Sequence, residues 1–175
     1  LTTSKNRLMH TLGQAGTEVN FQILEEACNI VLGNDSTNPN FGTANKALMD
    51  FQAREDAWNY VGPLIDSTTS IGTKFFGIKI FFDLVRFKWA MLDPDQRQSI
   101  KDFACQHVYE WALDRSIPPY LINQLDSVLV ELIIREWPQE WPDIVNNIIE
   151  SATSEPMTCI NNLKILAMLS HQVVD

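Results

Sequence analysis

The sequence predicts an all-α protein, on three observations. Apolar residues recur at spacings of three and four along most of the 175 residues, strict alternation over a strand's length is hard to find, and Gly or Pro separates the periodic segments. The 45% apolar and 20% charged residues are typical of a globular domain rather than a disordered or disulfide-stabilised chain. A chain of this length can bury a hydrophobic core.

Three helices are expected in the N-terminal part of the chain, after a polar segment over residues 1–18. The first helix covers residues 19–33 and ends at Gly33-Asn34-Asp35, and the second follows Pro39. A short third helix starts near Glu55, and Gly62-Pro63 is expected to interrupt it. The positions expected to face the core are Phe21, Leu24, Ala27, Cys28 and Val31, then Phe41, Ala44, Leu48 and Phe51, then Trp58, Val61, Leu64 and Ile65.

Five more helices are expected downstream. The fourth spans about 71–91, the fifth about 94–115 and the sixth about 120–136, where Trp137-Pro138 stops it. Pro142 is the expected first residue of the seventh, and the eighth starts near Pro156. The expected core positions are Ile100, Phe103, Ala104, His107, Val108 and Trp111, then Leu121, Leu125, Val128, Leu129, Leu132 and Ile133, then Ile144, Val145, Ile148 and Ile149, then Ile160, Leu163, Leu166, Leu169 and Val173.

The spacing of these helices indicates a repeat architecture. They form sequential pairs whose starts lie roughly 36 to 48 residues apart, the pitch of HEAT or armadillo repeats. The sequence therefore predicts a HEAT-repeat solenoid of about four helical pairs, with a closed helical bundle as the alternative. Because the last apolar stripe reaches Asp175 without a stop signal, we expect the chain to be a fragment of a longer protein.

The charge balance restricts the class of partner. There are 22 acidic and 13 basic residues, which give a formal charge of −9, so nucleic acid and anionic membranes are disfavoured and a basic or neutral protein is favoured. The apolar run from Ile71 to Trp89 contains five charged residues and cannot be a membrane span. We expect neither direct nucleic-acid binding nor membrane insertion.

No pattern of catalytic or metal-binding residues stands out. Cys28, Cys105 and Cys159 are far apart and lack CxxC or Cys/His ligand spacing, so each is expected to be a small core residue in a reducing compartment. His107 lies only two positions from Cys105, which on a helix points the two side chains apart. We therefore expect a protein that is not an enzyme and has no catalytic residues, cofactor or metal.

A Trp-Pro pair occurs twice, as Trp137-Pro138 and Trp141-Pro142. Each proline is expected to fix a sharp turn between helices, and each indole to fill the corner between them. This rare string and several others, in the same order and spacing, resemble the N-terminal region of importin-beta-family (karyopherin) transport receptors, over about residues 19–175. Within that family the exportins for leucine-rich nuclear export signals are the most similar. The matching strings are Val19-Asn20 with Leu24, Asp56-Ala57-Trp58, Lys74-Phe75-Phe76-Gly77-Ile78 with Ile80, Val85 and Lys88-Trp89, Glu136-Trp137-Pro138 with Trp141-Pro142, and Asn162 with Ile165-Leu166, Leu169-Ser170, Val173 and Asp175.

The resemblance implies a function as well as a fold. Members of this family are HEAT-repeat superhelices whose N-terminal repeats bind the small GTPase Ran in its GTP state, and in the exportins the cargo groove lies in repeats far downstream. The chain would then be the Ran-GTP-binding part of a receptor that shuttles between nucleus and cytoplasm and meets nucleoporins. Another karyopherin, an importin or RNA exporter, and a HEAT scaffold with no GTPase partner are the alternatives.

Candidate contacts for Ran follow from the pairing of helices. In HEAT arrays the second helix of each pair lines the concave side, so its polar positions opposite the packed stripe are candidates. We favour Lys79, Asp83 and Arg86, because charges that interrupt a very apolar helix must leave the core. The complete set is Thr43, Lys46 and Asp50 on the second helix, Lys79, Asp83 and Arg86 on the fourth, and Gln124, Ser127, Glu131 and Arg135 on the sixth.

Overall fold

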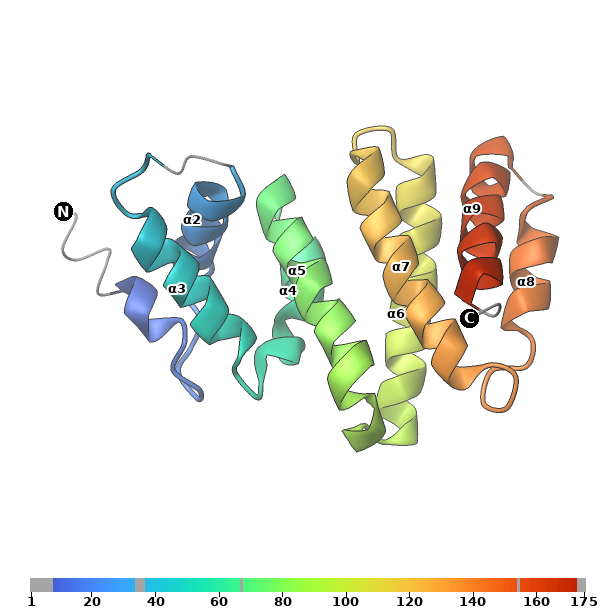
Figure 1. The fold of residues 1–175 in the computed structure, drawn as a ribbon, viewed down its shortest axis with the longest axis horizontal. Coiled ribbons are helices and arrows are strands. Elements are labelled where there is room, and N and C mark those ends of the chain that lie inside the picture. The colour runs from blue at the N-terminus through green and yellow to red at the C-terminus, as the bar shows by residue number, and fades with distance from the viewer. Residues whose placement is uncertain (1–7, 34–36, 67, 154, 173–175) are drawn as a thin grey trace. The chain divides into compact units, whose positions relative to one another are not determined.

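The computed structural model describes residues 8–33, 37–66, 68–153 and 155–172, and it contains only helices and connecting segments over those ranges. The predicted all-α class is therefore confirmed (Figure 1). The chain divides into two compact units, Leu1–Phe81 and Phe82–Asp175. The expected stop at Asn34-Asp35 and the expected core position Val173 lie outside the described residues.

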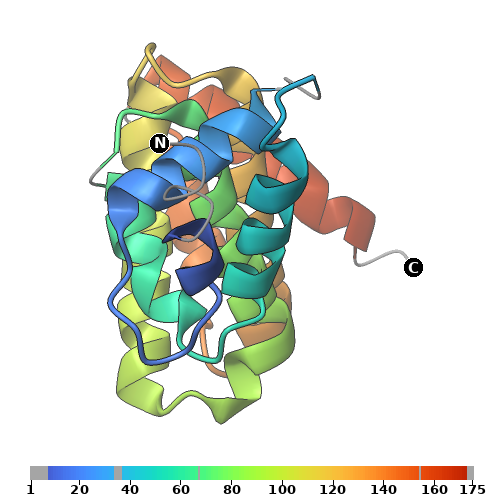
Figure 2. The same cartoon turned by 90° about the vertical axis from the view of Figure 1, so that its left-hand side faces the viewer.

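Unit 1 is built around two adjacent helices, α2 and α3, which lie side by side in Figures 1 and 2. The side chain of Asn20 caps α2 by accepting a hydrogen bond from the backbone N–H of Ile23 at 3.2 Å. Apart from Phe41, which is half-buried, the expected core positions of α3 are buried. The elements of unit 1 are α2 (Phe21–Leu32), α3 (Phe41–Gln52), the 3₁₀-helix η1 (Ala57–Tyr60), α4 (Val61–Asp66) and α5 (Ile71–Asp83), whose last two residues belong to unit 2.

A buried arginine holds the described part of the N-terminal segment in unit 1. The guanidinium of Arg54, a residue that is 3% exposed, donates to the carbonyl oxygens of Leu12 at 2.9 Å and Thr17 at 3.3 Å. It also forms two hydrogen bonds of 2.7 Å to Asp56, and these lower the pKa of that carboxyl. Met9 and Leu12 are buried as well, so residues 8–18, expected as a separate polar segment, contribute two side chains to the core of unit 1.

Unit 2 contains the longest helices. A capping box starts α6, because the Asp93 side chain accepts from the Gln96 N–H at 2.8 Å and the Gln96 side chain accepts from the Asp93 N–H at 3.0 Å. All six expected core positions of α7 are buried, against α6 and α9. The elements are the π-helical turn η2 (Leu84–Lys88), the 3₁₀-helix η3 (Trp89–Met91), α6 (Pro94–Leu113), α7 (Pro119–Glu136), α8 (Ile144–Ser151) and α9 (Pro156–Gln172).

Two proline predictions were wrong in detail. Gly62-Pro63 does not interrupt a helix, because both residues lie in the first turn of α4, where the missing N–H of proline has no helical partner to lose. The change of helix type comes earlier, between Tyr60 and Val61. Pro142 is not the first residue of α8, which begins at Ile144 after Asp143.

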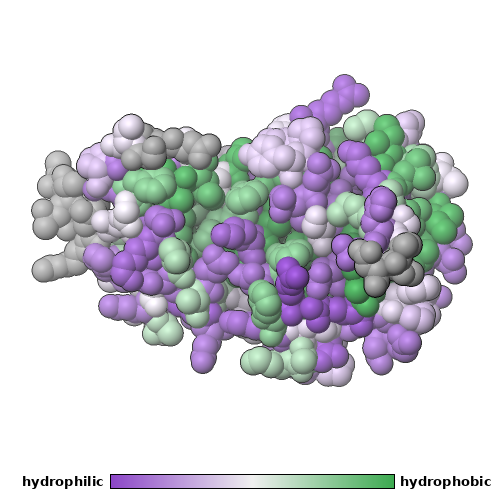
Figure 3. Space-filling view, viewed as in Figure 1, coloured by the Kyte–Doolittle hydropathy of each residue, from purple (hydrophilic) through white to green (hydrophobic). Residues whose placement is uncertain are grey.

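Several expected core positions are exposed instead. Phe21 is 39% exposed and Ile149 is 51% exposed. On α9 the error is larger, because Ile160 and Leu163 are 52% and 58% exposed while Asn161 and Asn162 are buried. The two asparagines can be buried because they are hydrogen-bonded, to Asp126 at 2.9 Å and to the Ile148 carbonyl at 2.9 Å. Apolar residues therefore appear on the surface over α9 (Figure 3).

The close packing of α5 on α4 depends on Gly77. A Cβ at this buried glycine would lie 2.9 Å from Leu64 Cβ and 3.1 Å from Ile65 Cγ1. We predict that Gly77→Ala lowers the free energy of unfolding by about 1–3 kcal/mol, because the two helices must separate. Gly42→Ala is the matched control, since nothing lies within 4 Å of its added Cβ on α3. Gly42→Ala should leave the free energy of unfolding unchanged or raise it by up to ~1 kcal/mol. Urea denaturation measures both variants, and an equal loss of free energy of unfolding for both would contradict the prediction.

Candidate partner-binding surface

The candidate positions on α3 lie at the surface and pair with each other. Lys46 Nζ lies 2.8 Å from Asp50 Oδ2, and their side chains are 65% and 44% exposed. The two residues are one helical turn apart, so the pair is a local one that water screens. Thr43, on the same helix, is half-buried. The three candidate residues on α3 therefore carry no net charge together.

The fourth predicted helix has the expected extent but changes type. It is α-helical to Asp83, forms a π-helical turn over η2 and ends as the 3₁₀-helix η3. Lys79 and Arg86 are exposed, and Asp83 is half-buried. The spacing that places these three on one face assumes an unbroken α-helix, and the π-helical turn has more residues per turn, so spacing alone no longer fixes the face that Arg86 occupies.

The π turn also removes two large apolar side chains from the buried face. In an α-helix, Phe87 and Met91 would continue the stripe of Ile80 and Leu84, at spacings of three and four. Ile80 and Leu84 are each 3% exposed, whereas Phe87 is 72% and Met91 77% exposed. The exposure of Phe87 and Met91 could not be predicted from the apolar spacing, because that spacing predicts burial at both positions.

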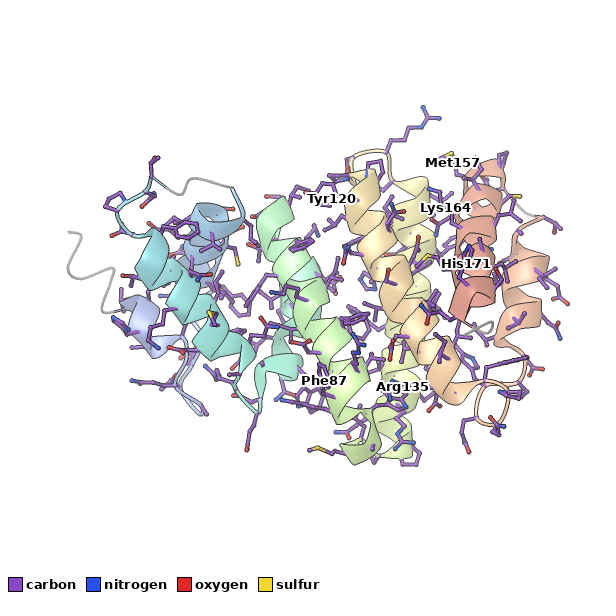
Figure 4. The ribbon with its side chains drawn as sticks, viewed as in Figure 1. Phe87, Tyr120, Arg135, Met157, Lys164 and His171 are labelled. Carbon is purple, nitrogen blue, oxygen red and sulfur yellow. The ribbon has the colours of Figure 1, made fainter. Side chains whose placement is uncertain are left out.

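The candidate positions on α7 are connected to η2 through Arg135. Its Nη2 donates to Glu131 Oε1 at 2.9 Å and to the carbonyl oxygen of Arg86 at 3.0 Å. Gln124 is exposed, and the hydroxyl of the half-buried Ser127 donates to the Asn123 carbonyl at 2.9 Å. The structure thus brings Glu131, Arg135 and Arg86 together, and Figure 4 shows Phe87 and Arg135 near the same end of α7.

The last residue of α7, directly after Arg135, is a buried carboxylate. Glu136 is 4% exposed, and its Oε1 accepts from the indole N–H of Trp89 at 2.6 Å. Its Oε2 accepts from Nζ of Lys101 at 3.3 Å, and this ammonium lies 5.3 Å from the ring centre of Trp141. The expectation that both Trp-Pro indoles fill helix corners was wrong for Trp137, which is 43% exposed.

A second buried carboxylate, Asp126, joins α7 to α9. It is 0% exposed, and its Oδ1 accepts from the Asn161 amide at 2.9 Å, while no hydrogen bond reaches Oδ2. Burial raises the pKa of Asp126 to about 6, against smaller lowering effects of the Asn161 hydrogen bond and the charge of Lys164. The carboxyl is therefore more easily protonated than an ordinary aspartate.

In the part of the chain that the structure describes, the cysteine and histidine side chains lie apart in ordinary packing environments. Burial raises the pKa of the Cys28 thiol to about 12 and that of Cys105 to about 11, which keeps both protonated and unreactive. His107 is buried, with Nδ1 2.8 Å from the Phe103 carbonyl. The described ranges hold no cluster of three or more His, Cys, Asp or Glu side chains suited to a metal ion. The arrangement supports noncovalent contacts.

None of the described helices is long and apolar enough to span a bilayer.

The fold and its surface define a protein of paired α-helices of the HEAT-repeat type, and comparisons with known proteins agree. Residues 44–110 match the importin-beta N-terminal domain, and residues 118–175 match the exportin 1-like protein family. Similar curated proteins include Exportin 1A of Arabidopsis thaliana, 28% identical over 136 residues, Exportin-1 of Schizosaccharomyces pombe, 27% over 135, and Exportin-1 of Dictyostelium discoideum, 25% over 158.

The two matches and the exportin relatives together support the importin-beta family for this chain, whose sequence is similar to an exportin-1-like N-terminal region. The three alignments cover 75%, 75% and 89% of this chain but 13%, 12% and 15% of the respective relatives. The chain thus spans a small part of the length of the curated relatives that it matches. The predicted family and repeat class are confirmed.

The Glu136 network predicts a large loss of stability when its charge is removed. We expect Glu136→Gln to lower the free energy of unfolding by about 3 kcal/mol, because Lys101 would keep a buried positive charge without a partner. The added change Lys101→Met should recover most of the loss. Glu131→Gln is the control, since it breaks a partly exposed ion pair that contributes at most about 1 kcal/mol. Urea denaturation of the four proteins measures this, and equal losses for the two Glu variants would contradict it.

Asp126 predicts a pH-dependent stability difference. Its pKa in the folded protein, about 6, lies above the value of about 3.9 in an unfolded chain, so the ionised form opposes folding at neutral pH. The protonated carboxyl costs no folding stability at low pH. The protein loses stability as pH rises through 6, where the buried carboxyl ionises. Asp126→Asn should therefore stabilise the protein by ~1–3 kcal/mol at pH 7.5, and this advantage should shrink towards pH 5. Thermal denaturation at both pH values tests the trend, and a constant difference would refute it.

Proposed function

We propose that this chain is the Ran-GTP-binding N-terminal part of a nuclear export receptor for leucine-rich signal cargo. The observation that carries the proposal is the order of the two family matches, an importin-beta N-terminal domain followed by an exportin 1-like segment. Exposed polar positions in each unit support it, Lys46 and Lys79 in unit 1 and Gln124 in unit 2, because each is accessible to a protein partner.

The proposed mechanism is binding rather than catalysis. GTP orders the switch loops of a GTPase, so contacts made only to the ordered loops give the receptor a higher affinity for the GTP state. Hydrolysis of the bound GTP converts the GTPase to its low-affinity state, and the receptor then releases it. The chain needs no catalytic residue and no cofactor for this function.

The wider function follows from the same proposal. Cargo would bind to downstream repeats of the longer receptor, nucleoporins would contact that receptor during passage, and the protein would shuttle between nucleus and cytoplasm. The exportin relatives support this assignment over an importin or a scaffold with no GTPase partner.

A nucleotide-dependent pull-down tests the proposal. Immobilised Ran carrying a non-hydrolysable GTP analogue should retain the 175-residue chain at least tenfold better than Ran carrying GDP. Equal retention in both states, or none in either, would exclude the transport function and leave the scaffold alternative.

Lys79→Glu tests the candidate surface within the same assay. Lys79 is exposed on α5, so the change should weaken retention by Ran-GTP about tenfold without shifting the melting temperature. Arg115→Glu, at an exposed position between α6 and α7, is the matched charge-reversal control and should have no effect. Equal weakening by both variants would mean that overall charge, not this surface, governs binding.

A further inference from the structure

Charges in unit 2 are segregated between two sets of helices. The exposed carboxylates lie on α6, α8 and the connecting segments, with Asp102, Glu110 and Glu150 as examples. The structure describes every residue of η2, α7 and α9. Within these elements the exposed charged residues are Arg86, Arg135 and Lys164. The acidic balance of the sequence thus belongs to one set of helices and not to the other.

The carboxylates of η2, α7 and α9 are turned inward. Asp126 and Glu136 are buried, and Glu131 is half-buried and accepts a hydrogen bond from Arg135. Asp83, just before η2, is half-buried as well. A partner that approaches these elements therefore meets positive charge on a chain whose total formal charge is −9.

Exposed aromatic and apolar side chains accompany these cations. Phe87 is 72% exposed, and the Arg86 guanidinium lies 5.9 Å from its ring centre. Figure 4 shows Phe87 and Arg135 near one end of the face and Lys164 farther along it on α9. Arg135 joins η2 to α7 through the Arg86 carbonyl. An exposed aromatic side chain beside an arginine is a combination enriched at protein interfaces.

We propose that this cationic face, defined by Arg86, Phe87, Arg135 and Lys164, docks an acidic protein surface, with Phe87 as the apolar anchor. The identity of the partner rests on the proposed function. The new element is that the GTPase must present acidic side chains to this face. Charge complementarity selects an acidic occupant. A protein is favoured over nucleic acid because a phosphate backbone carries a continuous line of negative charge that would also meet the exposed carboxylates of the neighbouring helices, whereas a protein surface can place its carboxylates opposite the cations alone.

A labelled peptide of glutamate and leucine tests the chemistry without Ran. Fluorescence anisotropy should show binding to the 175-residue chain that weakens as salt is raised. A lysine and leucine peptide is the control: the exposed carboxylates of α6 and α8 attract it, so the substitutions below should not weaken its binding. Arg86→Glu, Lys164→Glu and Phe87→Ala should each weaken binding about tenfold, whereas Arg115→Glu should not. Circular dichroism should show unchanged melting for these exposed positions.

The proposal is overturned if the acidic peptide does not bind, if the substitutions leave its affinity unchanged, or if a single-stranded RNA binds this face more tightly than the peptide. A second arm repeats the variants with Ran-GTP. Acidic-peptide binding that depends on Arg86 and Phe87, without nucleotide-dependent Ran binding, would reject the proposed function and support this inference. Nucleotide-dependent Ran binding that none of the substitutions weakens would do the reverse.

Discussion

The buried carboxylate of Glu136 is the constraint on which the geometry of unit 2 depends. An ionised group in an apolar interior is stable only when its charge and lone pairs are satisfied, and here Trp89 and Lys101 do this from two other elements. The last residue of α7 is thereby fixed against η3 and α6 at once. Because Arg135 precedes Glu136 directly, the same contacts determine where Arg135 reaches η2 at the surface.

Polar contacts of this kind recur at other junctions within each unit. Arg54 holds the segment before α2, Asp126 and Asn161 join α7 to α9, and Asn162 joins α9 to α8. Apolar helix faces alone tolerate small shifts along the helix axis. A shift at one of these positions would leave a buried polar group without a partner, so the polar contacts fix which residues meet.

The same network relates the fold to the surface that a partner would meet. A net charge is an average over a whole chain, and it says little about one face. In unit 2 the carboxylates of α7 are buried or half-buried, which leaves Arg86, Arg135 and Lys164 as the exposed charges of η2, α7 and α9. The acidity that favours a basic partner in the sequence therefore resides on other helices. The family membership and the local chemistry of the face provide independent information about partners.

The sequence alone determined the helices, their pairing and the family, because these depend on local periodicity, on proline and capping residues, and on short strings in a fixed order. Thus α7 and its six buried positions could be predicted nearly residue by residue. Tertiary structure decided which faces are covered: it buried Asn161 and Asn162 and exposed Ile160 and Leu163, since hydrogen bonds from distant residues can satisfy a buried amide. It also placed the π turn that exposes Phe87, because helix type in an apolar run depends on packing partners that no local pattern contains.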